Sequence, residues 1–170
     1  GKTTKLLKLL RAELLRGTSP KRIAFVSFTR AACNEALERV GSQLGLTQDD
    51  MPWLRTIHSA AYRLLQLRRD QVMADDRWRE FASQYGYDLT EFVEFDPDSP
   101  GEPPRRTAAD EWRYVISWGR NRRLPVDQAM ARFATPVSVS QVRRFASSVA
   151  SFKSEHGLLD FHDMLEQVLY

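Results

Sequence analysis

The six residues from Ile23 to Phe28 form a run that is apolar except at Ser27, and the run lies between two segments with a helical pattern. A leucine face between positions 6 and 14 precedes the run, and small and branched apolar residues repeat at helical spacing over 31–44. A strand that is apolar along its whole length is typical of a parallel sheet covered by helices on both faces. The sequence therefore predicts an α/β fold, with a second short strand at 53–56 and a helix over 58–68.

The chain opens on Gly1, Lys2, Thr3 and Thr4, directly before the first helix. These residues match the end of the phosphate-binding pattern G-x-x-x-x-G-K-[ST]. In such a loop, backbone N–H groups and the helix N-terminus surround the phosphates, the lysine reaches the β- and γ-phosphates, and the hydroxyl residue holds Mg²⁺. We expect Lys2 and Thr3 to have these two roles. The alternative is a lysine and a threonine that cap an ordinary helix.

The character of the chain changes near Asp70. From there to about Ala150 the apolar spacing is helical, without a second strand pattern. The segment from Leu158 to Leu165 then begins another helix, for which Asp160 is the expected N-cap. We therefore expect an α/β part, a helical part and a final amphipathic helix.

Charge is distributed in two opposing blocks. Between Asp70 and Glu102 ten acidic residues accompany two arginines, whereas between Arg105 and Arg144 nine arginines accompany three acidic residues. The basic block suits either a phosphate backbone or a solvated helical surface. Its densest cluster consists of Arg120, Arg122 and Arg123.

Composition excludes several other classes of protein. No stretch approaches the ~20 apolar residues of a membrane span, and we expect no leader sequence. The single cysteine, Cys33, cannot form an internal disulfide and fits a reducing, cytoplasmic compartment, where it is expected to pack in the core. A helix cap with solvated side chains is a better interpretation than a metal site for His156, Asp160, His162 and Asp163.

Four segments, in this order, resemble the UvrD/Rep family of superfamily 1 DNA helicases. Gly1–Thr4 is similar to the end of motif I, and Phe25–Val40 is similar to motif Ia. Arg55–Tyr62 is similar to the T-F-H-S segment, and Leu159–Leu165 to the D-F-D-D-L-L helix that precedes motif II. The chain departs from the usual residues at Ser27, Arg30, Ala31 and Ile57.

The resemblance implies a partial P-loop, RecA-like parallel-sheet domain with an all-helical insertion. Residues 1–68 would form the first part of the ATP-binding domain, 69–152 the insertion, and 153–170 the return to the domain, truncated before motif II. The acidic residues of motif II and the second RecA-like domain would then belong to the remainder of the same protein. This stretch alone is therefore expected not to hydrolyse ATP.

The resemblance also implies a role for each candidate residue at the nucleotide. ATP and Mg²⁺ would bind at Gly1, Lys2, Thr3 and Thr4. Lys2 would neutralise charge on the transferred phosphoryl group, and Thr3 would hold the metal.

Single-stranded DNA would cross the carboxyl edge of the sheet. The implied contacts there are Phe28, Thr29, Arg30, Thr56 and His58. Core packing is the alternative for Phe28, and capping or packing the alternative for His58. The arginine cluster 120–123 would contact a DNA backbone from the insertion, or else form a surface loop without a partner.

The implied activity is that of an ATP-dependent 3′–5′ DNA helicase or translocase in repair, replication or recombination. Its partners would be single-stranded DNA, junctions of single- and double-stranded DNA, and accessory repair proteins, without a membrane. The alternatives are the motor part of a helicase–nuclease, a non-hydrolysing single-stranded DNA-binding remnant, and a P-loop kinase or other NTPase. The last of these leaves the Thr29 and His58 segments without a role.

Overall fold

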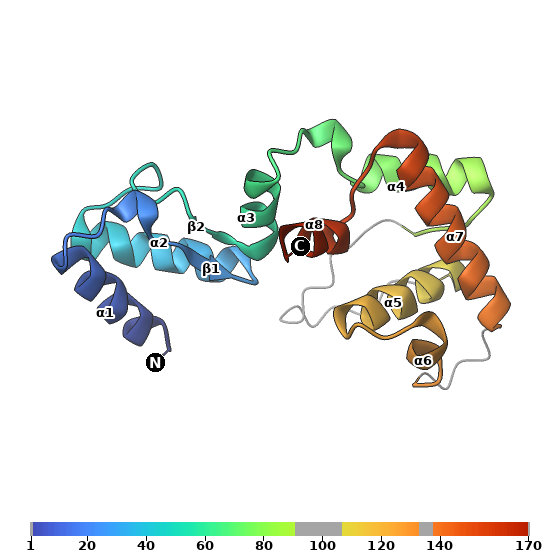
Figure 1. The fold of residues 1–170 in the computed structure, drawn as a ribbon, viewed down its shortest axis with the longest axis horizontal. Helices are drawn as coiled ribbons and strands as arrows, with labels where there is room; N and C mark the ends of the chain where they lie inside the picture. Colours follow the sequence, from blue (N-terminus) through green and yellow to red (C-terminus); the bar gives the residue numbers. More distant parts are fainter. Residues whose placement is uncertain (1, 91–106, 133–137, 170) are drawn as a thin grey trace. The chain divides into compact units, whose positions relative to one another are not determined.

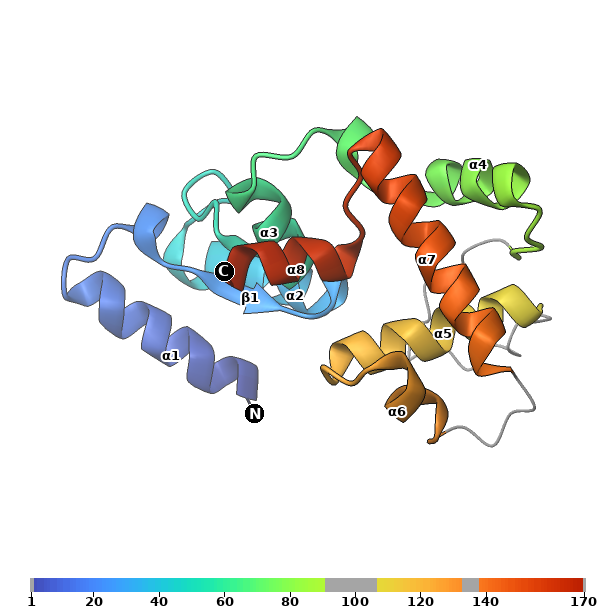
Figure 2. The same cartoon turned by 45° about the vertical axis from the view of Figure 1, so that its right-hand side comes forward.

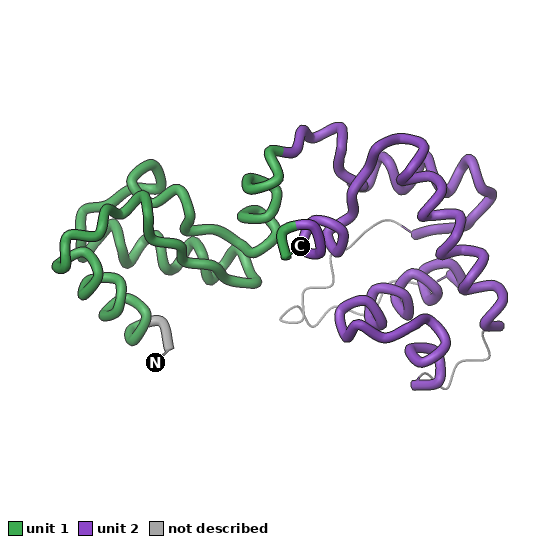
Figure 3. The backbone as a smooth tube through the Cα atoms, viewed as in Figure 1, with its two compact units in different colours: residues 1–66, 168–170 green, residues 67–167 purple. Residues whose placement is uncertain are grey.

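The chain folds as two compact units (Figure 3). The computed structural model describes residues 2–90, 107–132 and 138–169. Unit 1 comprises residues 1–66 with 168–170, and unit 2 comprises residues 67–167. Each unit has an apolar core of its own. Within the described ranges, no helix combines the length and the apolar character needed to cross a membrane.

Unit 1 is an α/β arrangement built on two short parallel strands (Figure 1). Its elements in chain order are α1 (Lys2–Leu15), the 3-10 helix η1 (Pro20–Arg22), β1 (Phe25–Ser27), α2 (Arg30–Leu44), β2 (Leu54–Thr56) and α3 (Ile57–Leu64). In the register of the two strands, Phe25 pairs with Leu54 and Ser27 pairs with Thr56. The predicted parallel pairing is therefore confirmed, although both strands are shorter than the apolar run.

The core of unit 1 lies between α1, α2 and one face of the sheet. Leu7 and Leu10 of α1 meet Cys33 of α2, with Leu54 of β2 in the same cluster. Ala36, Val40 and Met51 complete its buried part. Cys33 is thus a packing residue, as predicted, and burial raises the pKa of its thiol. Gly45 caps the C-terminus of α2, and its φ of +66° is the left-handed conformation that glycine adopts at low cost.

Only one face of the apolar run is buried among the described residues. Ile23 and Phe25 pack against the core, whereas Val26 and Phe28 are 52% and 83% exposed. Successive residues of a strand point to opposite faces of the sheet, and the core with α1 and α2 occupies one of these faces. The second face of the strand is therefore uncovered among the described residues, and cover on both faces stays a prediction. Phe28 does not pack in the core that the described residues form.

Unit 2 is helical in its described residues, apart from one parallel bridge between Val72 and Leu159. Its elements are η2 (Arg69–Gln71), α4 (Asp75–Tyr85), α5 (Ala108–Asn121), α6 (Val126–Met130), α7 (Val139–His156) and α8 (Phe161–Leu169), whose last residues group with unit 1. The long helix α7 packs against α4, α5 and α6, and α6 also packs against α5 (Figures 1 and 2).

An aromatic cluster forms the core of unit 2. Phe81 is fully buried at its centre. Its ring centroid lies 5.1–5.7 Å from those of Trp78, Tyr85, Tyr87, Phe145 and Phe152. These separations are typical of favourable edge-to-face and offset aromatic pairs. The cluster joins α4 to α7, so it holds together helices that are far apart in the sequence.

Close contact between α5 and α6 depends on Gly119. A Cβ atom added at Gly119 would lie 2.8 Å from the Cβ of Ala129 and 3.3 Å from the carbonyl oxygen of Leu124. Gly119 and Ala129 are both buried. Gly41 is a matched contrast, because it is an exposed glycine within α2 whose added Cβ would lie 3.6 Å from its nearest neighbour, the carbonyl oxygen of Leu46.

We expect Gly119→Ala to destabilise the protein by roughly 1–3 kcal/mol, because the new methyl group forces α6 away from α5. Gly41→Ala is the control, and we expect it to stabilise the protein by up to about 1 kcal/mol, since alanine favours a helix interior. Free energies of unfolding from urea titrations measure both. An equal gain for the two variants would contradict the α5–α6 packing.

Candidate functional site

The carboxyl ends of β1 and β2 lie side by side. The strands are parallel, and Ser27 pairs with Thr56 at the last position of the register (Figure 1). Phe28 and Thr29 follow the first strand directly, and His58 follows the second. In parallel α/β sheets ligands bind at this edge. The fold therefore brings the two predicted groups of DNA-contact residues to one edge of the sheet.

Two helices begin at this edge, and each has a threonine N-cap. Thr29 accepts a hydrogen bond from the backbone N–H of Ala32 at 3.2 Å, and Thr56 accepts one from that of Ser59 at 3.3 Å. The first turn of a helix carries free N–H groups and a partial positive charge. Two such termini at one edge favour an anion such as a phosphate.

The threonine caps leave one donor each for a ligand. A capping hydroxyl accepts a bond from the backbone but keeps its own proton to donate. Within the described ranges, the hydroxyl protons of Thr29 and Thr56 meet no acceptor. The residue pattern predicted contacts at both positions, but not their capping role.

The side chains beside these caps are an exposed aromatic ring and an exposed cation. Phe28 projects from the end of β1 into solvent, and Arg30 opens α2 with an exposed side chain. His58 lies in the first turn of α3 and is half-buried. An aromatic ring can stack a base of any sequence, while guanidinium and backbone N–H groups hold phosphates.

Arg55 belongs to the same edge, although the sequence pattern did not single it out. Its Nε donates to the carbonyl oxygen of Pro52 at 2.6 Å, and one terminal nitrogen donates to the hydroxyl of Ser59 at 3.2 Å. Arg55 therefore ties the segment before β2 to the first turn of α3. Its place directly before Thr56 was the available signal. A charged residue in a sequence, however, does not show whether its side chain binds neighbouring residues or solvent.

The sequence that we predict to bind phosphate lies at a helix N-terminus. α1 begins at Lys2, so Thr3 and Thr4 belong to its first turn, while Gly1 lies outside the described residues. That turn contains no acidic residue, which suits an anionic ligand. In the described ranges no three His, Cys, Asp or Glu side chains gather as a metal site.

The three arginines predicted as DNA contacts in unit 2 have different surroundings. The guanidinium of Arg120 is surrounded by carboxylates of α8 and is only 25% exposed. Arg122 lies over the ring of Trp118, with 4.1 Å from its Cζ to the ring centroid. Arg123 is exposed, with φ at +54°. A phosphate contact by Arg120 stays a prediction, and a phosphate there would compete with three carboxylates.

These carboxylates belong to an ion network that also includes Lys153 of α7. The Nζ of Lys153 lies 2.6 Å from Asp160 and 2.5 Å from Asp163. Burial opposes ionisation of Asp160, but Lys153 and Arg120 outweigh it and hold the pKa of this carboxyl at about 2. The predicted N-cap role of Asp160 is confirmed, since it accepts a bond from the backbone N–H of Asp163 at 2.9 Å.

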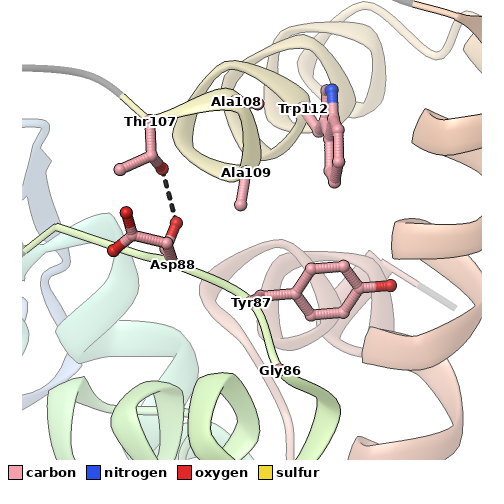
Figure 4. A pocket seen from close by; sticks show the side chains of 7 residues that line it. All are labelled: Gly86, Tyr87, Asp88, Thr107, Ala108, Ala109 and Trp112. Carbon is pink, nitrogen blue, oxygen red and sulfur yellow. Dashed lines mark hydrogen bonds between the residues drawn. The ribbon is translucent and has the colours of Figure 1, made fainter.

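A pocket of about 390 Å³ lies in unit 2 and contains none of the candidate residues (Figure 4). Its lining residues are Gly86, Tyr87, Asp88, Thr107, Ala108, Ala109 and Trp112. The hydroxyl of Thr107 donates to the carbonyl oxygen of Asp88 across it. Asp88 is the single charged residue among those that line it, so we do not include the pocket in the candidate site.

Parallel strands that follow a predicted phosphate-binding sequence are typical of the general class of P-loop α/β proteins. Comparison with protein families is more specific, because the model of the UvrD/REP helicase N-terminal domain matches residues 1–169. The chain therefore belongs to the UvrD/REP helicase family. Membership implies a RecA-like α/β fold, of which the described residues contain a two-stranded parallel sheet. No curated protein and no solved structure gives a significant match.

We expect Thr56→Ala to destabilise the protein by about 1 kcal/mol, because the N–H of Ser59 loses its acceptor at the start of α3. Thr56→Ser keeps a capping hydroxyl and is the control, with an expected loss of less than about half that amount. Chemical unfolding of the two variants measures the difference. Equal stabilities would show that the cap does not hold α3.

Proposed function

We propose that the chain is part of the ATP-binding motor domain of an ATP-dependent DNA helicase or translocase. ATP binds with Mg²⁺ at Gly1–Thr4, where the bound nucleotide and metal supply the phosphoryl chemistry. Lys2 neutralises negative charge on the phosphates, and Thr3 contributes its hydroxyl to the metal. The family match over residues 1–169 and the position of this sequence at the start of α1 support this assignment.

Single-stranded DNA binds along the carboxyl edge of β1 and β2 in this proposal. The observation that carries it is the convergence of an exposed ring, Phe28, with two threonine-capped helix N-termini at one edge. Phe28 stacks a base, while Thr29, Arg30, Thr56 and the helix N-termini hold phosphates, with His58 as a further contact. None of these interactions reads a base edge, so binding is independent of sequence.

Unit 2 is proposed to contain the helical insertion, residues 69–152, within the RecA-like domain. Its described helices pack as a compact body that begins at residue 67 and extends to 167, which includes α7 and most of α8. Residues 153–170 lead the chain back toward the RecA-like domain. Arg122 and Arg123 contact a DNA backbone near a junction of single and double strands. In the whole protein, ATP hydrolysis then drives 3′–5′ movement in repair, replication or recombination.

DNA-stimulated ATP hydrolysis by the full-length protein tests this function. We expect Lys2→Met to reduce the rate by at least about a hundredfold, because the charge on the transferred phosphoryl group is no longer neutralised. Affinity for single-stranded DNA should be retained. If the unaltered protein binds DNA but neither binds nor hydrolyses ATP, the DNA-binding remnant replaces the motor.

We expect Phe28→Ala to weaken binding of an oligothymidine by about 1–3 kcal/mol, since one stacking contact is lost. Leu15→Ala is the matched control, because Leu15 is similarly exposed, at 82% against 83%, but lies at the far end of α1 from the phosphate-binding sequence. Fluorescence anisotropy measures the affinities, and the free energy of unfolding should change little for either variant. Unchanged affinity of the Phe28 variant would contradict the stacking role.

A further inference from the structure

Arg120 spreads its guanidinium over one side of α8. One terminal nitrogen lies 2.9 and 3.1 Å from the two oxygens of Asp160, and the other lies 2.8 Å from both Asp163 and Glu166. The three acidic residues are spaced by three, so they share one side of the helix. A planar guanidinium can meet several carboxylates at once, whereas an ammonium group offers a single centre of charge.

The charge around Arg120 makes it a poor phosphate ligand. Three carboxylates meet two cations, Arg120 and Lys153, so the network carries a net negative charge. A DNA phosphate near Arg120 would have to displace carboxylates that already hold the guanidinium. Arg122 and Arg123, by contrast, are exposed and form no ion pair within the described residues.

The turn that carries Arg122 and Arg123 is built on the end of α5. The N–H of Arg123 donates to the carbonyl oxygen of Arg120 at 3.0 Å, and the N–H groups of Arg122 and Leu124 both donate to that of Gly119. Arg123 follows Arg122, the C-cap of α5, and has a positive φ. The orientation of both exposed arginines therefore depends on where the end of α5 is held.

We propose that Arg120 is a positioning residue, which anchors the end of α5 to α8 and so presents Arg122 and Arg123 to the DNA backbone. The partners of Arg120 lie 40–46 residues further along the chain, and the anchored carboxylates include the N-cap of α8. Loss of the guanidinium leaves Lys153 to compensate Asp160 and Asp163 and releases Glu166. The part of this inference that concerns DNA rests on the proposed function, whereas the anchoring of α8 does not.

Hydrogen–deuterium exchange of the full-length protein without DNA tests the anchor. We expect Arg120→Gln to speed amide exchange in α8 and at the end of α5 by about tenfold, with α4 unchanged as an internal reference for intact folding. Arg120→Lys keeps the charge but not the planar fork, and it should restore protection only in part. Unchanged exchange in α8 of the Gln variant would overturn the proposal.

Binding of an oligothymidine then separates positioning from contact. We compare Arg120→Gln, the double variant Arg122→Gln/Arg123→Gln, and the triple variant. If Arg120 acts through Arg122 and Arg123, Arg120→Gln weakens binding about fivefold in the otherwise unaltered protein. The same substitution made in the double variant then causes little further loss of affinity. An equal further loss in the triple variant would mean a direct phosphate contact and overturn the proposal.

Two remaining outcomes are also decisive. If the double variant binds DNA as tightly as the unaltered protein, Arg122 and Arg123 do not contact DNA, and the positioning role of Arg120 is overturned. The exchange experiment still tests whether Arg120 anchors α5 to α8. If the double variant binds weakly but Arg120→Gln binds normally despite faster exchange in α8, the anchor does not position the two arginines, and the proposal falls.

Discussion

The parallel pairing of β1 with β2 is the constraint on which the candidate interface depends. Both strands run in one direction, and their last residues, Ser27 and Thr56, pair with each other. Both strands therefore end at the same edge of the sheet. Each strand is followed closely by a helix. The pairing of the strands therefore suffices to bring the two helix N-termini and their threonine caps to one edge. An antiparallel pairing of the same segments would put Phe28 and Thr56 at opposite edges. The interface is therefore a property of the backbone topology first and of its side chains second.

Unit 2 is held together in a different way. Its core is an aromatic cluster around Phe81, whose members come from α4, α7 and the segment after α4. The helices α5, α7 and α8 are also joined by ion pairs among Arg120, Lys153 and three carboxylates. Partly buried ion pairs give little net stability, but removing one member leaves the others uncompensated. Charge here serves to define how three helices meet.

What the sequence predicted correctly depends on local chemistry. The parallel pairing of the strands, the packing role of Cys33 and the Asp160 cap each follow from a few neighbouring residues. The exposure of Val26 and Phe28 was missed, because an apolar run does not tell how many faces of a sheet are covered. The partners of Arg120 were missed because they lie far along the chain, and a cluster of arginines has the same pattern whether it faces a phosphate or a carboxylate. Arg55 was missed although its partners are local, because a charge in a sequence does not show whether the side chain binds its neighbours or solvent.

The network on α8 also determines the order in which the helical unit can form. A chain is synthesised from its N-terminus, and contacts between distant residues form after local ones because closing a long loop is costly in entropy. The ion pairs of Arg120 can form only after residues 160–166 have been synthesised. The bridge between Val72 and Leu159 likewise forms only after Leu159 has been added. A ribosome-bound chain that stops before these residues has α5 without its anchor and exposes part of the surface that α8 covers. The unit is thus completed by its last segment, which leaves its unfinished form open to chaperones for most of its synthesis.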